Sequence, residues 1–141
     1  MRVALVSCVK SKQSAPAPAQ DLYVSPLFRS LRRYAEINCD AWYILSAGYG
    51  LVSPTRVLAP YERTLNRMRK AERELWARNV QQQLSEVLPR GAGVMVLAGE
   101  RYRENLTPFL TSRGFRVEVP LQGLSFGRQL QFLGERLAGK W

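Results

Sequence analysis

Short apolar runs alternate with amphipathic helical segments along this chain, and this alternation limits the fold more than any other feature. The apolar runs have the character of strands buried on both faces. They span Arg2–Val9, Ala41–Ser46, Gly93–Ala98 and Phe115–Val119. Helical periodicity and capping residues predict helices over Pro26–Asn38, Arg69–Leu88, Tyr102–Ser112 and Ser125–Leu137. Strands that alternate with helices need crossover connections, so we expect an α/β fold. Specifically, the pattern predicts a three-layer α/β/α sandwich with a mainly parallel four-stranded sheet.

The segments between these elements carry turn and loop signals. Ala15–Ala19 alternates Ala and Pro, which predicts an extended loop. Ala47–Gly50 predicts a glycine turn, and the proline-punctuated stretch Leu51–Leu65 predicts an ordered loop. No repeat or shift in composition divides the chain, so residues 1–141 are expected to form a single α/β domain.

The chain has no histidine, and this narrows the chemistry that it can perform. Ser-His-Asp triads, Cys-His pairs and histidine-based zinc sites are excluded. Acid–base chemistry must therefore come from carboxylates, lysine, tyrosine, cysteine or the substrate itself. The two cysteines, Cys8 and Cys39, cannot make a disulfide framework and show no metal-ligand spacing. We expect neither a metal ion nor a cofactor.

The charge balance is strongly basic, with 21 Lys and Arg against 11 Asp and Glu and a net charge of +10. Such an excess on a small domain is typical of a protein with a polyanionic partner. We expect nucleic acid, DNA rather than RNA, and no membrane; the alternative is an arginine-rich surface without such a partner. No apolar run reaches the roughly 20 residues of a membrane span, and the first run is too short for a signal peptide. The expected location is the cytoplasm.

Polar clusters follow the predicted strands. In open parallel sheets, ligands bind beyond the carboxyl ends of the strands, so these clusters are candidate substrate-binding residues. The first strand leads to Ser7 and Cys8, with Lys10 and Lys12 able to hold a phosphate or carboxylate. After the second strand, small residues let backbone amides approach a ligand and a tyrosine offers a stacking face. The remaining strand-end candidates are Ser46, Ala47, Gly48, Tyr49, Gly50, Gly99, Tyr102 and Gly123.

A basic segment precedes and enters the longest predicted helix. Positive charge at a helix start opposes the helix dipole, which favours anions there. We therefore interpret this segment as a nucleic-acid backbone site, the alternative being a merely solvated face. Its residues are Arg56, Arg63, Arg67, Arg69, Lys70 and Arg73. The carboxylates able to reach the strand ends are Asp21, Glu62 and Glu100.

Several segments resemble a known family. They are Ser7-Cys8-x-x-Ser11-Lys12, Asp21-Leu22-Tyr23-x-Ser25-Pro26-Leu27-Phe28, Tyr43-Ile44-Leu45-Ser46-Ala47-x-x-Gly50-Leu51, Pro60-Tyr61-x-x-Thr64-Leu65, Ala98-Gly99-x-x-Tyr102 and Pro120-Leu121-x-Gly123-Leu124. On these residues the chain resembles a small bacterial and phage domain family of unassigned function. The Cys-Ser-Lys segment is similar to a domain of archaeosine synthase, a tRNA-modifying enzyme, and the group resembles the uracil-DNA-glycosylase-like α/β superfamily.

The resemblance implies a pocket at the strand ends for a flipped nucleobase, held by aromatic stacking and hydrogen bonds to its edge. The aromatic side chains available for stacking are Tyr23, Phe28, Tyr49, Tyr61 and Tyr102. The water-activating Asp motif and the leaving-group His motif of uracil glycosylases are absent. A lysine would instead bind phosphate, stabilise the leaving base or attack the sugar carbon as an amine. The catalytic candidates are Lys10 and Lys12, with Asp21 or Glu62 as the carboxylate.

Three functions follow from these observations. The leading hypothesis is a DNA glycosylase-like enzyme that acts on a modified nucleobase, in DNA repair or phage defence. The second is a nucleic-acid or nucleotide-binding module without chemistry. The third is an enzyme that transfers a deoxyribosyl group of free nucleosides, because the same strand-end geometry serves both kinds of substrate.

Overall fold

A computed structural model describes residues 1–7, 14–61 and 64–139. Five strands form the main sheet in the order β4-β3-β1-β6-β7. They are β1 (Arg2–Ser7), β3 (Ala41–Ser46), β4 (Gly50–Val52), β6 (Gly93–Leu97) and β7 (Arg116–Glu118). The pairs β1–β3, β1–β6 and β6–β7 are parallel, and β4 runs antiparallel to β3. The predicted α/β class and mainly parallel sheet are confirmed, but the sheet has five strands rather than four.

The fifth strand lies where the sequence predicts a turn and a loop. Gly50 has a φ of +76°, which closes the chain back on β3 and starts β4. Further along, β5 (Val57–Leu58) pairs antiparallel with β2 (Ala17–Pro18) as a separate two-stranded sheet. The predictions of a loop over Leu51–Leu65 and of an extended loop over Ala15–Ala19 are therefore wrong in part. Strands of two or three residues are too short to show a period of two, so the sequence carried no signal for them.

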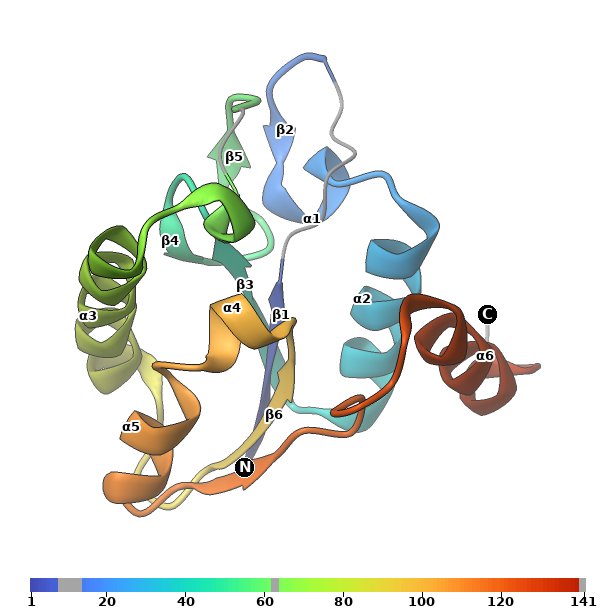
Figure 1. The fold of residues 1–141 in the computed structure, drawn as a ribbon. Coiled ribbons are helices and arrows are strands. Elements are labelled where there is room, and N and C mark those ends of the chain that lie inside the picture. The colour runs from blue at the N-terminus through green and yellow to red at the C-terminus, as the bar shows by residue number, and fades with distance from the viewer. Residues whose placement is uncertain (8–13, 62–63, 140–141) are drawn as a thin grey trace.

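Helices cover both faces of the sheet. In Figure 1, α2 and α6 lie on one side of the strands, and α3, α4 and α5 lie on the other. Their bounds are α2 (Pro26–Asn38), α3 (Lys70–Val87), α4 (Glu100–Arg103), α5 (Thr107–Ser112) and α6 (Phe126–Leu137). The predicted N-caps are confirmed, because Ser25 Oγ accepts from the Phe28 N–H at 3.1 Å and Ser125 Oγ accepts from the Arg128 N–H at 3.4 Å.

The predicted helix over Tyr102–Ser112 is two short helices, α4 and α5. Pro108 is the physical reason. In one continuous helix, Pro108 could not donate to the Glu104 carbonyl, and its ring would clash with the preceding turn. The structure instead places Pro108 in the first turn of α5, where a missing N–H costs nothing.

The core lies on both sides of β1, whose residues Val3–Val6 are at most 1% exposed. On α3 the buried stripe is formed by Trp76, Ala77, Val80 and Leu84. The spacing of apolar residues in the sequence also predicts Leu75 and Val87 near this stripe, but they are 56% and 39% exposed. No helix within the described ranges is both long enough and apolar enough to span a membrane.

A small cap lies at the carboxyl-terminal end of the parallel strands. It consists of β2, β5 and the one-turn helix α1 (Ala19–Leu22), and Figure 1 shows it beyond the ends of β1 and β3. The backbone N–H of Ala19 donates to the Arg56 carbonyl at 2.7 Å, which joins the two sides of the cap. A 3-10 helix, η1 (Leu65–Arg67), then leads into α3. The cap and η1 lie next to the carboxyl ends of the parallel strands, which is where open α/β sheets bind their ligands.

The edge strand β4 is covered by a side chain of α3. The Leu51 N–H donates to Gln83 Oε1 at 3.0 Å, and Gln83 Nε2 donates to the Leu51 carbonyl at 3.3 Å. The side-chain amide thus replaces a neighbouring strand, and it satisfies both backbone groups of Leu51.

We expect Gln83→Met to lower the free energy of unfolding by about 1–3 kcal/mol, because two backbone groups lose their partners while side-chain volume is kept. Urea unfolding followed by circular dichroism measures this. The matched control is Gln82→Met, whose side chain is exposed on the same helix. Equal stability of the two variants would show that Gln83 contributes nothing at this edge.

Candidate functional site

The carboxyl ends of β1, β3 and β6 meet at one edge of the sheet, as the sequence analysis expected. The register pairs Ser7 with Leu45, and Val6 with Leu97. Ser7 and Ser46 therefore end adjacent strands, and both are buried, at 5% and 0% exposure. Buried serines at the end of a sheet need hydrogen-bond partners, and those of Ser46 define the candidate site.

The centre of the site is a group of three hydroxyls from Tyr23, Ser46 and Tyr61. The Tyr23 and Tyr61 oxygens are 2.6 Å apart, Ser46 Oγ donates to the Tyr61 oxygen at 2.7 Å, and Tyr23 donates to Ser46 Oγ at 3.4 Å. These bonds close a ring when Tyr61 donates to Tyr23, so that each hydroxyl donates once and accepts once. We call this group the hydroxyl ring. Such chains of hydrogen bonds strengthen one another in a low-dielectric interior.

Tyr61 also lies directly against the turn that follows β3. A Cβ atom added to Gly48 would lie 2.9–3.1 Å from three atoms of the Tyr61 ring, so this contact requires glycine. Tyr49 packs edge-on against Tyr61 with ring centroids 5.4 Å apart, and its N–H donates to Ser46 Oγ at 3.1 Å. The guanidinium of Arg56 lies 5.6 Å from the Tyr49 ring. Aromatic faces and a cation therefore adjoin the hydroxyl ring.

The backbone of Ser46 is held from the opposite side by α3. Trp76 Nε1 donates to the Ser46 carbonyl at 2.9 Å in a buried contact. The Trp76 ring also packs edge-to-face against Tyr102, with centroids 5.7 Å apart. From the sequence, Trp76 is predicted only to lie on the apolar stripe of the long helix. Its indole N–H had to find a partner once buried, but the identity of that partner depends on the fold.

Three predicted glycine and alanine positions have structural roles that differ from one another. Ala47 is 3% exposed and belongs to the core. Gly99 caps α4, and Gly123, with a φ of +80°, lies in the turn before α6. At both glycines an added Cβ would meet no atom within 4 Å in the described structure. Neither position therefore needs glycine to make room for a neighbour, but the positive φ of Gly123 favours glycine there.

Several predicted residues cannot be placed. Cys8, Lys10, Lys12, Glu62 and Arg63 lie outside the described residues. Their proposed roles remain predictions. Asp21 is described: its carboxylate pairs with Arg32 at 3.2 Å, and the Arg32 guanidinium also donates to the Gln20 carbonyl at 3.0 Å.

The predicted phosphate-binding residues fall into two groups. Arg56, Arg67 and Arg69 are exposed, and Lys70 is exposed beside Glu74 at 4.0 Å. Arg73 is different. Its side chain is only 12% exposed, and it bonds to Glu104 at 2.8 Å and to the Met68 carbonyl at 2.6 Å. Within the described basic segment, Arg73 thus points into the protein.

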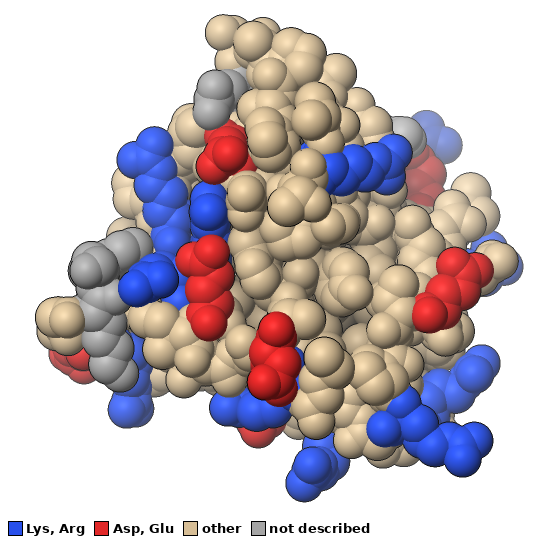
Figure 2. Space-filling model, turned by 180° about the vertical axis from the view of Figure 1, so that it is seen from behind, with Lys and Arg blue, Asp and Glu red and all other residues tan. Residues whose placement is uncertain are grey.

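The basic charge is spread over the face that Figure 2 shows. Blue side chains lie around the rim of a largely uncharged centre, and red side chains lie between them. Ion pairs such as Arg2–Glu118 at 3.1 Å also neutralise part of the positive charge of the protein. The excess of 10 positive charges does not produce one continuous basic patch on this face.

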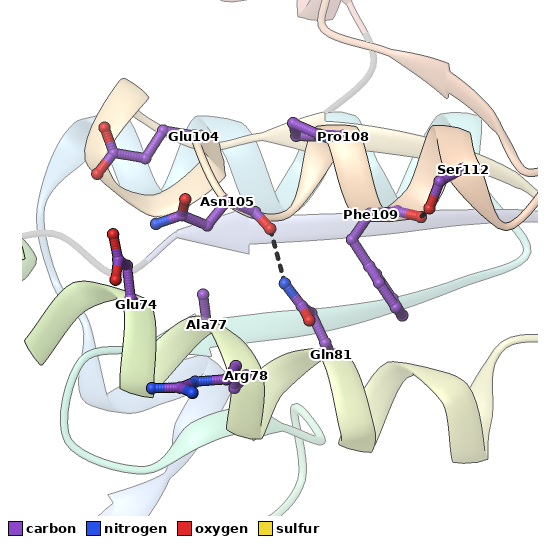
Figure 3. Close-up of a pocket in the computed structure, with 9 residues that line it drawn as sticks. All are labelled: Glu74, Ala77, Arg78, Gln81, Glu104, Asn105, Pro108, Phe109 and Ser112. Atoms are coloured by element: carbon purple, nitrogen blue, oxygen red, sulfur yellow. Dashed lines mark hydrogen bonds between the residues drawn. The ribbon is translucent and has the colours of Figure 1, made fainter. Parts of the chain in front are cut away.

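A groove lies between α3 and the α4–α5 segment, apart from the hydroxyl ring. It is an open groove of about 520 Å³, and Figure 3 shows its lining side chains. They are Glu74, Ala77, Arg78, Gln81, Glu104, Asn105, Pro108, Phe109 and Ser112. Gln81 Nε2 crosses the groove to donate to the Asn105 carbonyl at 2.9 Å. No local pattern in the sequence predicts this groove, because Gln81 and Asn105, which meet across it, are 24 residues apart in the chain.

Cys39 lies at the other end of the sheet, between α2 and β3. Burial raises the pKa of its thiol above the ordinary value, although Arg2 opposes this shift. A raised pKa favours the protonated thiol, which is the less nucleophilic form of cysteine.

Comparison with known proteins assigns the chain to a family. Residues 3–135 match the model of a "Family of unknown function (DUF6884)". The chain belongs to the DUF6884 family. This DUF6884 chain is also 36% identical over 59 residues to "Uncharacterized protein YfjM" of Bacillus subtilis (strain 168). The matched part is 38% of this chain and 39% of that relative, so the match spans about two fifths of the relative's length. No solved structure matches the chain significantly.

These matches confirm the predicted membership in a small-domain family of unassigned function. The resemblance of this DUF6884 chain to archaeosine synthase and to the uracil-DNA-glycosylase-like superfamily stays a prediction.

We expect Tyr23→Phe in this DUF6884 chain to lower the free energy of unfolding by about 1–3 kcal/mol, because it opens the hydroxyl ring in a buried setting. Chemical denaturation of the purified variant measures the loss. Tyr43→Phe, in β3, is the control and should change stability by less than about 0.5 kcal/mol. The interpretation fails if both variants unfold at the same denaturant concentration.

Proposed function

We propose that the strand-end site binds nucleic acid and acts on a nucleobase, in the manner of a DNA glycosylase-like enzyme. One observation carries the proposal: the hydroxyl ring of Tyr23, Ser46 and Tyr61 adjoins aromatic faces and one exposed arginine at the ligand end of an α/β sheet. A nucleotide needs these three kinds of group. Its base needs a stacking face and hydrogen-bonding partners, and its phosphate needs a cation.

The described residues divide these tasks between them. Tyr49 and Tyr61 are the candidates for stacking on the base. Their aromatic side chains pack against each other beside the hydroxyl ring, and both are partly exposed. Ser46 and Tyr23 are buried, and their hydroxyls hold the hydroxyl of the partly exposed Tyr61, which is the ring member proposed to meet the edge of the base. Arg56, within 5.6 Å of the Tyr49 ring, is placed to neutralise a phosphate attached to a stacked nucleotide.

The chemistry proposed for this site is cleavage of an N-glycosidic bond. A neutral Lys10 or Lys12 amine would attack the sugar C1′, and the bond from C1′ to the base nitrogen would break. The electron pair of that bond leaves with the base, which takes up a proton. Asp21 or Glu62 is the carboxylate proposed to accept the proton from the lysine amine.

A second function is favoured by one specific contact. The Asp21 carboxylate is engaged in an ion pair with Arg32 at 3.2 Å, so one of the two carboxylates proposed as the proton acceptor already has a structural partner. This pairing fits a nucleic-acid-binding module without chemistry. The third candidate, deoxyribosyl transfer between free nucleosides, differs from both in one respect: it requires saturable binding of mononucleotides and none of oligomers.

We expect binding of a single-stranded DNA oligonucleotide to weaken steeply with salt, because each phosphate contact releases a counterion. Arg69→Met should make the slope of log K against log salt shallower by about 1. Fluorescence anisotropy over a range of salt concentrations measures both slopes. The control is Arg90→Met, an exposed residue that precedes β6 at the other end of the sheet. A protein that binds mononucleotides but no oligonucleotide would support the deoxyribosyl-transfer alternative.

We expect the protein to release a base from some member of a panel of oligonucleotides that carry modified bases, leaving an abasic site or a covalent adduct with lysine. Borohydride trapping and mass spectrometry detect the adduct. Lys12→Arg and Lys10→Arg are the informative variants, because arginine keeps the charge but is not an amine nucleophile. One of these two substitutions should abolish release of the base. The affinity of that variant for the oligonucleotide should stay within about twofold of the unmodified protein's, which is less than half of the ~1.4 kcal/mol that a tenfold change represents. Tight binding with no release across the whole panel favours the binding module.

A further inference from the structure

Arg73 is held inside the protein by partners from two different segments. Its Nε donates to Glu104 Oε1 at 2.8 Å, and its Nη1 donates to the Met68 carbonyl at 2.6 Å. The side chains of Arg73 and Glu104 are 12% and 28% exposed. Charge-assisted bonds of this length in a partly buried setting are among the stronger polar contacts of a protein.

The two partners belong to segments that flank the candidate site. Met68 ends η1, where its N–H donates to the Leu65 carbonyl at 3.2 Å. Glu104 ends α4, which follows directly from the carboxyl end of β6. Both contacts come from the first turn of α3, so this single guanidinium joins η1, α3 and α4.

One turn further along α3, Trp76 continues the same connection. Its indole donates to the Ser46 carbonyl, and its ring packs against Tyr102 of α4. Residues three apart on a helix share one face. The face of α3 that carries Arg73 and Trp76 therefore contacts the segments that follow both β3 and β6.

We propose that Arg73 is a positioning residue of the strand-end site: it sets the spacing between η1 and α4 and contacts no phosphate. Through η1 it orients the exposed Arg67 and Arg69, and through α4 it orients Tyr102. The functional part of this inference rests on the proposed function. The sequence predicts Arg73 as part of a nucleic-acid backbone site, whereas this proposal gives it a role within the protein.

The role requires arginine rather than any cation. A guanidinium presents several N–H donors in a rigid plane, so it bonds to a carboxylate and a carbonyl in two directions at once. A lysine ammonium is a compact charge on a flexible stem. Lysine at position 73 would keep the positive charge but lose the fixed spacing between the two partners.

The experiment compares Arg73→Lys and Arg73→Met with the matched pair Arg69→Lys and Arg69→Met in oligonucleotide binding at several salt concentrations. We expect both Arg73 variants to bind at least tenfold more weakly than the unmodified protein, with an unchanged salt slope. Arg69→Lys should bind like the unmodified protein, and Arg69→Met should have a shallower slope. If Arg73→Lys binds normally and Arg73→Met has a shallower slope, Arg73 contacts phosphate and the proposal is overturned.

A second measurement separates this proposal from the proposed function. Near-ultraviolet circular dichroism reports the packing of tyrosine and tryptophan, and it needs no ligand. We expect Arg73→Lys and Glu104→Gln to change this spectrum in the same way, with no additional change in the double variant. If the protein binds no nucleic acid, the proposed function fails while this result still supports the positioning role. Unchanged spectra in all three variants would overturn the positioning role.

Discussion

The burial of Ser46 is the constraint on which the rest of the site depends. A serine with no exposed surface at the end of β3 carries a hydroxyl, an N–H and a carbonyl, and unpaired groups of this kind are costly in a protein interior. Trp76 satisfies the carbonyl from α3, while Tyr23 and Tyr61 satisfy the hydroxyl from the two sides of the cap. One residue thus determines where a helix, a cap and a turn must lie relative to the sheet.

Features that depend on local sequence were predictable, and features that depend on distant partners were not. Val3–Val6 had to form a buried strand, and Ser25 and Ser125 had to cap helices, because the cause lies within a few residues. The position of the candidate site was predicted from topology alone, and the ends of β1, β3 and β6 do meet at one edge of the sheet. The hydroxyl ring joins residues that are 15 to 38 positions apart in the chain, so no local spacing pattern in the sequence predicts it. The same holds for Arg73, whose partner Glu104 lies 31 residues away.

Composition described the charge of this protein correctly but not its arrangement. An excess of 10 positive charges suggested a basic patch, yet arginines here also act as structural connectors. Arg32 joins α1 to α2, and Arg73 joins η1 to α4. A guanidinium suits this use because it remains charged when half-buried and satisfies several acceptors together. Counting arginines therefore overestimates the charge available to a polyanion.

The contact between Gln83 and β4 has a consequence for how the chain folds as it is synthesised. Residues 50–52 leave the ribosome before residues 70–87, so β4 can pair with β3 while its outer backbone groups still lack Gln83. During that interval the nascent sheet has an open edge, which is the feature that leads partly folded chains to join one another. Docking of α3 closes this edge and, through Trp76, also brings a donor to the Ser46 carbonyl. The contact of Arg73 with Glu104 can form only later, because residue 104 is synthesised after α3. The same helix therefore first protects the edge of the sheet and then receives the last segment of the site.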